Sequence, residues 1–170
     1  MKISARAILA CIWGAIIIAA LSAPLLLSGS FSTAAFFNYL PFSFFCHQIP
    51  ERSFTLFHYP LAVCHRCTGI YFGLFLGTLL SPVFFRIPPR VQRASIISAA
   101  ALLALDALLP FTGLWNGFRL CRFMTGLVFG ISAAPFAVVG FGEILKDIRR
   151  KTSIKGLCVM KRKARGGIAA

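Results

Sequence analysis

The sequence has little charge, and negative charge is almost absent. Only 13% of its 170 residues are charged, and Asp and Glu number four against 18 Lys and Arg. Soluble domains contain about 25% charged and about 45–50% apolar residues. This chain is 58% hydrophobic, with a mean hydropathy of +0.83. These figures exclude a water-soluble globular domain, a disordered chain, a collagen and a small secreted disulfide scaffold, and they are typical of a multi-pass membrane protein.

Four apolar runs are long enough to cross the hydrocarbon core of a bilayer, which takes about 20 helical residues. They cover approximately residues 8–27, 68–85, 94–109 and 120–141. The apolar part of a cleaved signal peptide has about 7–15 residues, so the longer first run is expected to be retained. Small residues such as Gly126 and Gly130 give the fourth run a face for close helix packing. The predicted fold class is an all-α membrane protein, with a four-helix transmembrane bundle over residues 1–145 and a basic cytoplasmic tail over 146–170.

The positions of the basic residues predict the orientation. With the N-terminus in the cytoplasm, fourteen of the 18 Lys and Arg lie on the cytoplasmic side and four lie outside. Cytoplasmic loops are enriched in Lys and Arg, so the sequence predicts a cytoplasmic (inner) membrane protein with both termini in the cytoplasm. Its partners are then the lipid bilayer and, at the basic tail, anionic lipid, and the positive charge requires no nucleic acid.

The segment 28–63 differs from the four apolar runs. It contains eight of the 18 Phe residues, and Pro41, Pro50 and Pro60 interrupt it. Because proline interrupts helices, the segment cannot form one spanning helix. Two alternatives remain open: a re-entrant or interfacial segment, or a folded apolar loop that caps the helices.

Cysteine and histidine gather on the predicted outer side. Cys46-His47 lies in the Phe-rich loop, and Cys64-His65-Arg66-Cys67 lies where the second span begins. Unpaired N–H groups at a helix N-terminus and the positive charge of Arg66 both lower a thiol pKa, and the thiolate is the form that binds metals or attacks disulfides.

Three interpretations of this cluster remain open. The first is a metal site formed by Cys46, His47, Cys64 and Cys67, a ligand set suited to zinc, although thiolates also bind copper(I) or iron. The second is thiol–disulfide chemistry, which an oxidising compartment permits. The third is an inert disulfide that attaches the loop to the second span.

Asp106 lies in the apolar run A-L-L-A-L-D-A-L-L-P, about one turn before the outer end of the third span. An ionisable residue at this depth predicts a functional site or a structural ion pair. Arg119 and Arg122 share one face at the start of the fourth span and are its expected partners. A functional Asp106 would relay protons or hold a polar substrate, as in a small transporter. The catalytic candidates are therefore Cys64, Cys67 and Asp106, and the candidates for cofactor binding are Arg52, Arg66, Arg119 and Arg122.

Two segments, C-H-Q-I-P-E-R-S-F (46–54) and V-C-H-R-C-T-G-I-Y-F-G (63–73), resemble the signature of an uncharacterised prokaryotic membrane-protein family, a domain-of-unknown-function family. Asp106 and the run N…R…R…T-G…G from Asn116 to Gly130 resemble its downstream pattern, whereas Cys121 is outside it. The resemblance implies no reaction. It implies that the family residues are Cys46, His47, Arg52, Ser53, Phe54, Cys64, Arg66, Cys67, Thr68, Gly69, Tyr71 and Gly73.

The arrangement is also similar, at the level of architecture, to four-helix membrane disulfide oxidoreductases that pass electrons to a quinone. This similarity implies a quinone-proximal pair, Cys64 and Cys67, and a shuttle pair, Cys46 and Cys121. Quinone is a cofactor only under this alternative.

Overall fold

The computed structural model describes residues 2–29, 31–112 and 118–166, and most of them are helical. The long helices are α1 (Lys2–Ser28), α3 (His65–Phe84), α4 (Pro89–Leu108) and α5 (Arg119–Gly166). Each contains a segment long and apolar enough to cross a membrane: Ala5–Ser28, His65–Phe84, Pro89–Leu108 and Arg119–Thr152. The all-α membrane fold expected from the sequence is confirmed. Helix α5 crosses the predicted 145/146 boundary without a break.

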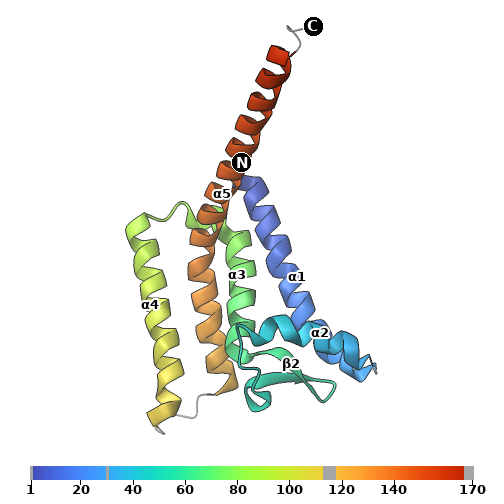
Figure 1. Ribbon diagram of the computed structural model, residues 1–170. Helices are drawn as coiled ribbons and strands as arrows, with labels where there is room; N and C mark the ends of the chain where they lie inside the picture. The colour runs from blue at the N-terminus through green and yellow to red at the C-terminus, as the bar shows by residue number, and fades with distance from the viewer. Residues whose placement is uncertain (1, 30, 113–117, 167–170) are drawn as a thin grey trace.

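The four long helices run side by side in the order α4, α5, α3, α1 (Figure 1). Helix α5 packs on both α3 and α4, and α1 packs mainly on α3. The start of α1 and the last turns of α5 lie at one end of the bundle. A β-hairpin lies at the other end of the bundle, which we call the hairpin end. The end with the start of α1 and the last turns of α5 is called the opposite end.

Helices α3 and α5 meet along a seam of glycines. Gly69, Gly73 and Gly77 of α3 face Gly126 and Gly130 of α5, at the four-residue spacing that places residues on one helix face. A Cβ atom on Gly77 would lie 2.6 Å from the Cβ of Ala134, and one on any of the others would overlap the backbone of the partner helix. Small residues allow helix backbones to approach this closely. The small face predicted on the fourth span is confirmed at Gly126 and Gly130.

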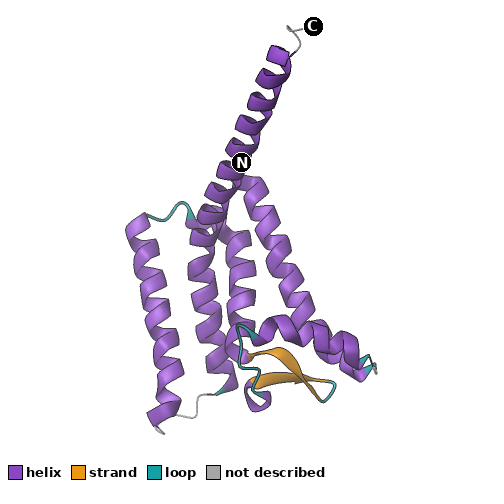
Figure 2. Ribbon diagram, viewed as in Figure 1, coloured by secondary structure: helices purple, strands orange, loops and turns teal. Residues whose placement is uncertain are grey.

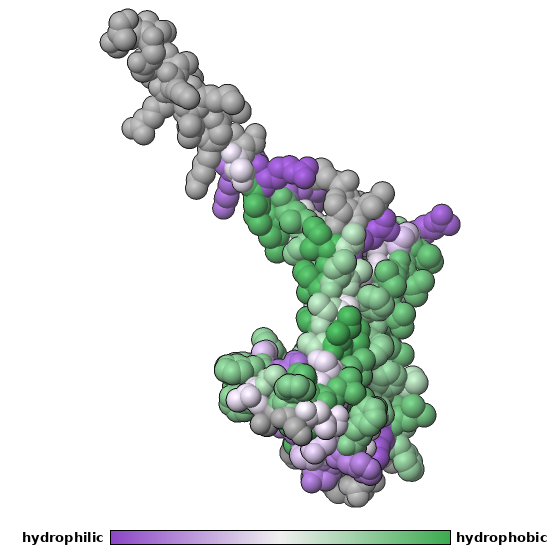
Figure 3. Space-filling model, turned by 90° about the vertical axis from the view of Figure 1, so that its right-hand side faces the viewer, coloured by the Kyte–Doolittle hydropathy of each residue, from purple (hydrophilic) through white to green (hydrophobic). Residues whose placement is uncertain are grey.

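Apolar side chains cover the sides of the bundle between its two ends. Figure 3 shows them as a continuous surface, with hydrophilic residues gathered at either end. Leu79, Ile97, Leu105 and Val128 are examples of large apolar side chains that remain exposed. In a membrane these side chains contact lipid tails, so their exposure carries no hydrophobic cost.

The Phe-rich segment folds into a short helix and a hairpin (Figure 2). Helix α2 (Ser32–Ser43) is followed by a 3-10 turn, η1 (Pro50–Arg52), and by antiparallel strands β1 (Ser53–Leu56) and β2 (Tyr59–Cys64). Another 3-10 turn, η2 (Leu109–Thr112), follows α4. We call residues 32–64 the cap.

The hairpin turn consists of two non-glycine residues with positive φ angles, Phe57 at 53° and His58 at 68°. Positive φ at both central residues is the geometry of a tight two-residue hairpin turn. It aligns Leu56 with Tyr59 and Ser53 with Cys64, with one irregularity between Ser53 and Thr55. Strand β2 continues directly into α3, because Cys64 ends the strand and His65 begins the helix.

A small hydrophobic core joins the cap to the bundle. Ala20 and Ala23 of α1 pack against Phe42 of α2 and against Ala62 and Val63 of β2. The segment therefore folds against the helix ends, and the re-entrant or interfacial alternative stays a prediction. The cap also buries a cysteine in this core, Cys46, whose residue is 5% exposed.

Candidate metal centre

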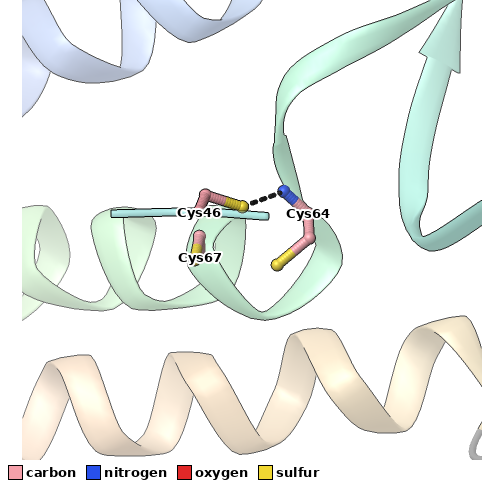
Figure 4. A group of neighbouring side chains, drawn as sticks. All are labelled: Cys46, Cys64 and Cys67. Carbon is pink, nitrogen blue, oxygen red and sulfur yellow. Dashed lines mark hydrogen bonds between the residues drawn. The ribbon is translucent and has the colours of Figure 1, made fainter. Parts of the chain in front are cut away.

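Three cysteines from separate parts of the cap and α3 converge at the hairpin end. Cys46 lies in the segment after α2, Cys64 is the last residue of β2 and the N-cap of α3, and Cys67 lies in the first turn of α3. Figure 4 shows their side chains meeting in one small region. The three sulfur atoms all lie within 4.8 Å of one another, and the three thiols are free.

Local hydrogen bonds position these thiols. The backbone N–H of Cys64 donates to Sγ of Cys46 at 3.2 Å, as Figure 4 shows. The backbone N–H of Cys46 donates to the carbonyl of Phe42 at 2.9 Å. Thr68 donates its hydroxyl to the carbonyl of Cys64 at 3.0 Å. Cys46 is therefore oriented toward the start of α3 by backbone contacts on both sides.

The segment that carries Cys46 is fixed by Gln48. Its side-chain amide donates to the carbonyl of Tyr39 at 2.8 Å and to that of Ala62 at 3.0 Å, so it links α2 to β2. The Tyr39 hydroxyl donates in turn to the carbonyl of Pro60. Gln48 was not among the residues predicted from the sequence, although its place two residues after Cys46 was a usable signal.

The surroundings favour ionisation of one thiol. The pKa of Cys64 lies far below its ordinary value, first because Cys46 and Cys67 hydrogen-bond to its sulfur and then because backbone N–H groups of α3 do so. The pKa of Cys46 is raised, mainly by its hydrogen bond with Cys64. The first thiolate of the group therefore forms at the N-terminus of α3, where the helix dipole favours negative charge.

The other candidate ligands lie elsewhere. The side chain of His47 is exposed and lies outside the group of three sulfurs. Cys121, in the first turn of α5, is exposed and also lies outside it. The side chain of Cys158, in the predicted basic tail, is outside the described residues, as is Asn116 of the family pattern.

Asp106 is buried, as its position predicts, but its ion-pair partner differs from the expected one. The partner is Arg66 of α3, whose Nε contacts the Asp106 carboxylate while Nη2 donates to the Asp106 backbone carbonyl. The expectation of Arg119 or Arg122 was wrong. Helix α5 lies between α3 and α4, and the long side chain of Arg66 spans the distance to α4.

The remaining candidate arginines and one histidine of α3 differ in burial. Arg52 and Arg119 are exposed and Arg122 is half-buried. The histidine is His65, which is 1% exposed and packs edge-to-face on Phe54 with 4.2 Å between the ring centroids. Sequence reasoning did not select His65, because a histidine inside a C-x-x-C motif gives no sign of its burial.

Comparison with known proteins places the chain in a family. Residues 46–151 match the family described as "Predicted membrane protein (DUF2085)". The chain belongs to this family. The matched region of DUF2085 begins at Cys46 and includes Cys64, Cys67 and Asp106, so the whole candidate site lies within it. The membrane-protein family expected from the cysteine motifs is confirmed.

Two archaeal relatives are similar over the greater part of their length. The uncharacterised protein MJ1492 of Methanocaldococcus jannaschii is 34% identical over 112 residues, which cover 63% of this chain and 70% of the relative. An uncharacterised protein of Methanothermobacter thermautotrophicus is 35% identical over 101 residues, covering 58% of this chain and 88% of the relative. No solved structure matches the chain.

Proposed function

We propose that this DUF2085 protein binds one transition-metal ion, with zinc as the first candidate, through Cys46, Cys64 and Cys67. The observation that carries the proposal is the convergence of three free sulfurs, from three segments, within 4.8 Å of one another. A zinc–sulfur bond of about 2.3 Å requires sulfurs about 3.8 Å apart in a tetrahedral site. The three thiols can reach this spacing through small side-chain rotations.

The chemistry of the group supports the same conclusion. Three thiolates form a soft ligand set, which suits zinc and copper(I) better than magnesium or calcium. Cys64 already favours its thiolate, so one ligand is ready to bind. His47 is exposed, and we leave it out of the proposed ligand set.

A metal in this position would join the cap to the bundle. Cys46 belongs to the cap segment that Gln48 holds, whereas Cys67 belongs to α3. A structural metal contributes its binding free energy to folding, so its removal would loosen the cap. The cap carries exposed aromatic side chains such as Phe44 and Phe45. In a loosened cap these side chains would no longer have fixed positions relative to the bundle.

Metal analysis of the detergent-purified full chain tests the proposal. We expect about one equivalent in the wild type, as one set of ligands requires, and loss of the metal in Cys46→Ser, Cys64→Ser and Cys67→Ser. The matched control is Cys121→Ser, which changes an exposed cysteine at the same end of the bundle and should retain the metal. Wild-type protein without metal after purification under reducing, metal-replete conditions would refute the proposal, as would full retention in the three variants.

The same geometry supports a second candidate, thiol–disulfide exchange. Three free thiols within 4.8 Å of one another can form a disulfide between Cys64 and either neighbour. Oxidation of two thiols to a disulfide releases two electrons and two protons, and a membrane quinone would accept both to become a quinol. Only Cys46 of the predicted shuttle pair lies in this group.

Alkylation of free thiols in the native membrane separates the two candidates. Reversible loss of two alkylatable thiols on addition of an oxidised quinone, with no bound metal, would favour exchange. Three thiols that become alkylatable only after chelation would favour the metal site.

A further inference from the structure

The hairpin end carries a concentration of positive charge that the proposed metal site does not explain. Arg52 ends η1, Arg66 lies in the first turn of α3, and Arg119 and Arg122 lie in the first turn of α5. The carboxylates of this end are Asp106 and the exposed Glu51, since Glu143 and Asp147 lie far along α5. This end therefore carries four guanidinium groups and only two carboxylates. One of the carboxylates, Asp106, already forms an ion pair with Arg66.

Packing contacts bring these groups to one place. Ser53 pairs with Cys64, so the backbone of Arg52, which precedes Ser53, lies next to that of His65, which follows Cys64. A Cβ on Gly126 would overlap the backbone carbonyl of Arg66, so the first turns of α3 and α5 are in direct contact.

Ring contacts and charges confirm the same proximity. The Phe54 ring contacts both His65 and Phe123, the neighbour of Arg122, with centroid distances of 4.2 and 6.0 Å. The charges of Arg52 and Asp106 both act on Arg122.

Two side chains in this cluster have buried nitrogen atoms without hydrogen-bond partners among the described residues. They are Arg122, through its Nε, and His65, through both ring nitrogens. The backbone of Arg52 lies next to the His65 ring. Buried polar groups in native proteins nearly always have partners, so these nitrogens are available to bind an ion, water or ligand.

Two helix N-termini add to the positive potential. Helices α3 and α5 both begin here, at His65 and Arg119, and their first N–H groups and dipoles favour an anion. The membrane spans of these helices also begin at these residues. In a bilayer crossed by these spans, the cluster would lie where the hydrocarbon core meets the headgroup layer.

We propose that Arg52, Arg119, Arg122 and His65 form a binding site for a phosphate oxyanion at the hairpin end. Guanidinium groups match the geometry and charge of phosphate, and several of them can share its oxygens. The phosphate would belong to a free ion or to a phospholipid headgroup. The site is distinct from the three thiols, so the inference does not rest on the proposed metal.

The charge of Cys64 acts on both His65 and Arg122, so metal-bound thiolates are an alternative counter-charge for the arginines. If the thiolates fill that role, Arg122→Gln should release the metal without affecting phosphate. If the cluster binds phosphate, Arg122→Gln should weaken phosphate binding and leave the metal content unchanged.

The test is isothermal titration calorimetry, in which inorganic phosphate is titrated into the detergent-solubilised full chain and the heat of binding is measured. We expect saturable binding in the wild type, at least tenfold weaker in Arg122→Gln and unchanged in the control Arg93→Gln, an exposed arginine of α4 toward the opposite end. Arg119→Gln changes an exposed side chain and should weaken binding similarly, so the test stands even if Arg122→Gln fails to fold. No saturable binding, or equal binding in all variants, would overturn the proposal.

A second arm identifies the source of the phosphate. The wild type and Arg122→Gln would be reconstituted in nanodiscs of phosphatidylcholine with or without phosphatidic acid. Stabilisation of the wild type by phosphatidic acid, lost in the variant, would assign a lipid headgroup. Stabilisation by inorganic phosphate alone would assign a free anion.

Discussion

Polar contacts organise the hairpin end, whereas helix α1 and helix α5 enclose an apolar groove of about 580 Å³ at the opposite end. Ile8, Val138 and Val139 are among the residues that line it, and Lys146 and Arg149 contribute its basic side chains. The hairpin end instead carries a buried ion pair, a hairpin and three converging thiols. Defined polar geometry is what a binding site requires, and it is concentrated at one end of this bundle.

The two ends also carry equivalent features in different surroundings. Each has an ion pair, a glycine in α5 and a glutamine that donates to two carbonyls. Paired substitutions at these positions therefore measure how strongly each end depends on its contacts.

The largest difference is expected for the ion pairs. Asp106→Asn should lower the free energy of unfolding by about 3 kcal/mol, the lower end of the range for a broken buried pair, because Arg66 retains part of its solvent contact. Glu143→Gln breaks the exposed pair with Lys146 and should change stability by less than about 0.5 kcal/mol. Thermal and denaturant unfolding in detergent would measure both. Equal effects would show that Arg66–Asp106 is not a structural contact.

A smaller difference is expected for the glycines. Gly126→Ala places a methyl group against the backbone of Arg66 and should cost about 1–3 kcal/mol through overpacking. Gly140→Ala meets no atom within 4 Å and should raise helix stability by up to about 1 kcal/mol. The same unfolding measurements apply, and a stabilising Gly126→Ala would contradict the close seam between α3 and α5.

The smallest stability difference, with the sharpest functional contrast, is expected for the glutamines. Gln48 links Tyr39 to Ala62, and Gln92 donates to the carbonyls of Phe84 and Ile87 at 2.6 and 3.0 Å. Replacing either with Glu removes the donor and should cost about 1–2 kcal/mol. Only Gln48→Glu should also weaken metal binding, by about tenfold, because it loosens the segment that carries Cys46. A competition titration with a chromogenic chelator would measure this, and equal affinities in both variants would contradict the positioning role.

The long-range organisation of the membrane helices could be predicted from the sequence. Apolar length alone identified four spans, and the small residues around Gly126 and Gly130 predicted the packed face of the fourth. Lipid contact makes the outer helix surfaces uniformly apolar, so hydropathy is a direct signal for spans. The orientation inferred from the basic residues stays a prediction.

The hairpin could not be predicted, because its turn residues are unusual. Phe57 and His58 occupy positive φ angles that favour Asn and Gly, and the strands contain Pro60 and little polar alternation. Because the hairpin was not predicted, the pairing of Ser53 with Cys64 could not be predicted from the sequence either. The same holds for the position of the Arg52 backbone next to His65.

The cysteine cluster was predicted in part. The spacing of Cys64 and Cys67 at a helix start places both sulfurs on one side, so their proximity follows from the motif. The positions of Cys46 and His47 depend on the local backbone, which buries the first and exposes the second. The partner of Asp106 depended on how the helices are ordered, which spacing along the chain does not specify.

X-ray absorption at the zinc edge of the metal-replete full chain tests the central claim most directly. We predict three sulfur ligands at about 2.3 Å, unchanged in Cys121→Ser and reduced in Cys46→Ser. A first shell of nitrogen and oxygen ligands, or a spectrum that Cys46→Ser leaves unchanged, would contradict the proposed three-cysteine site.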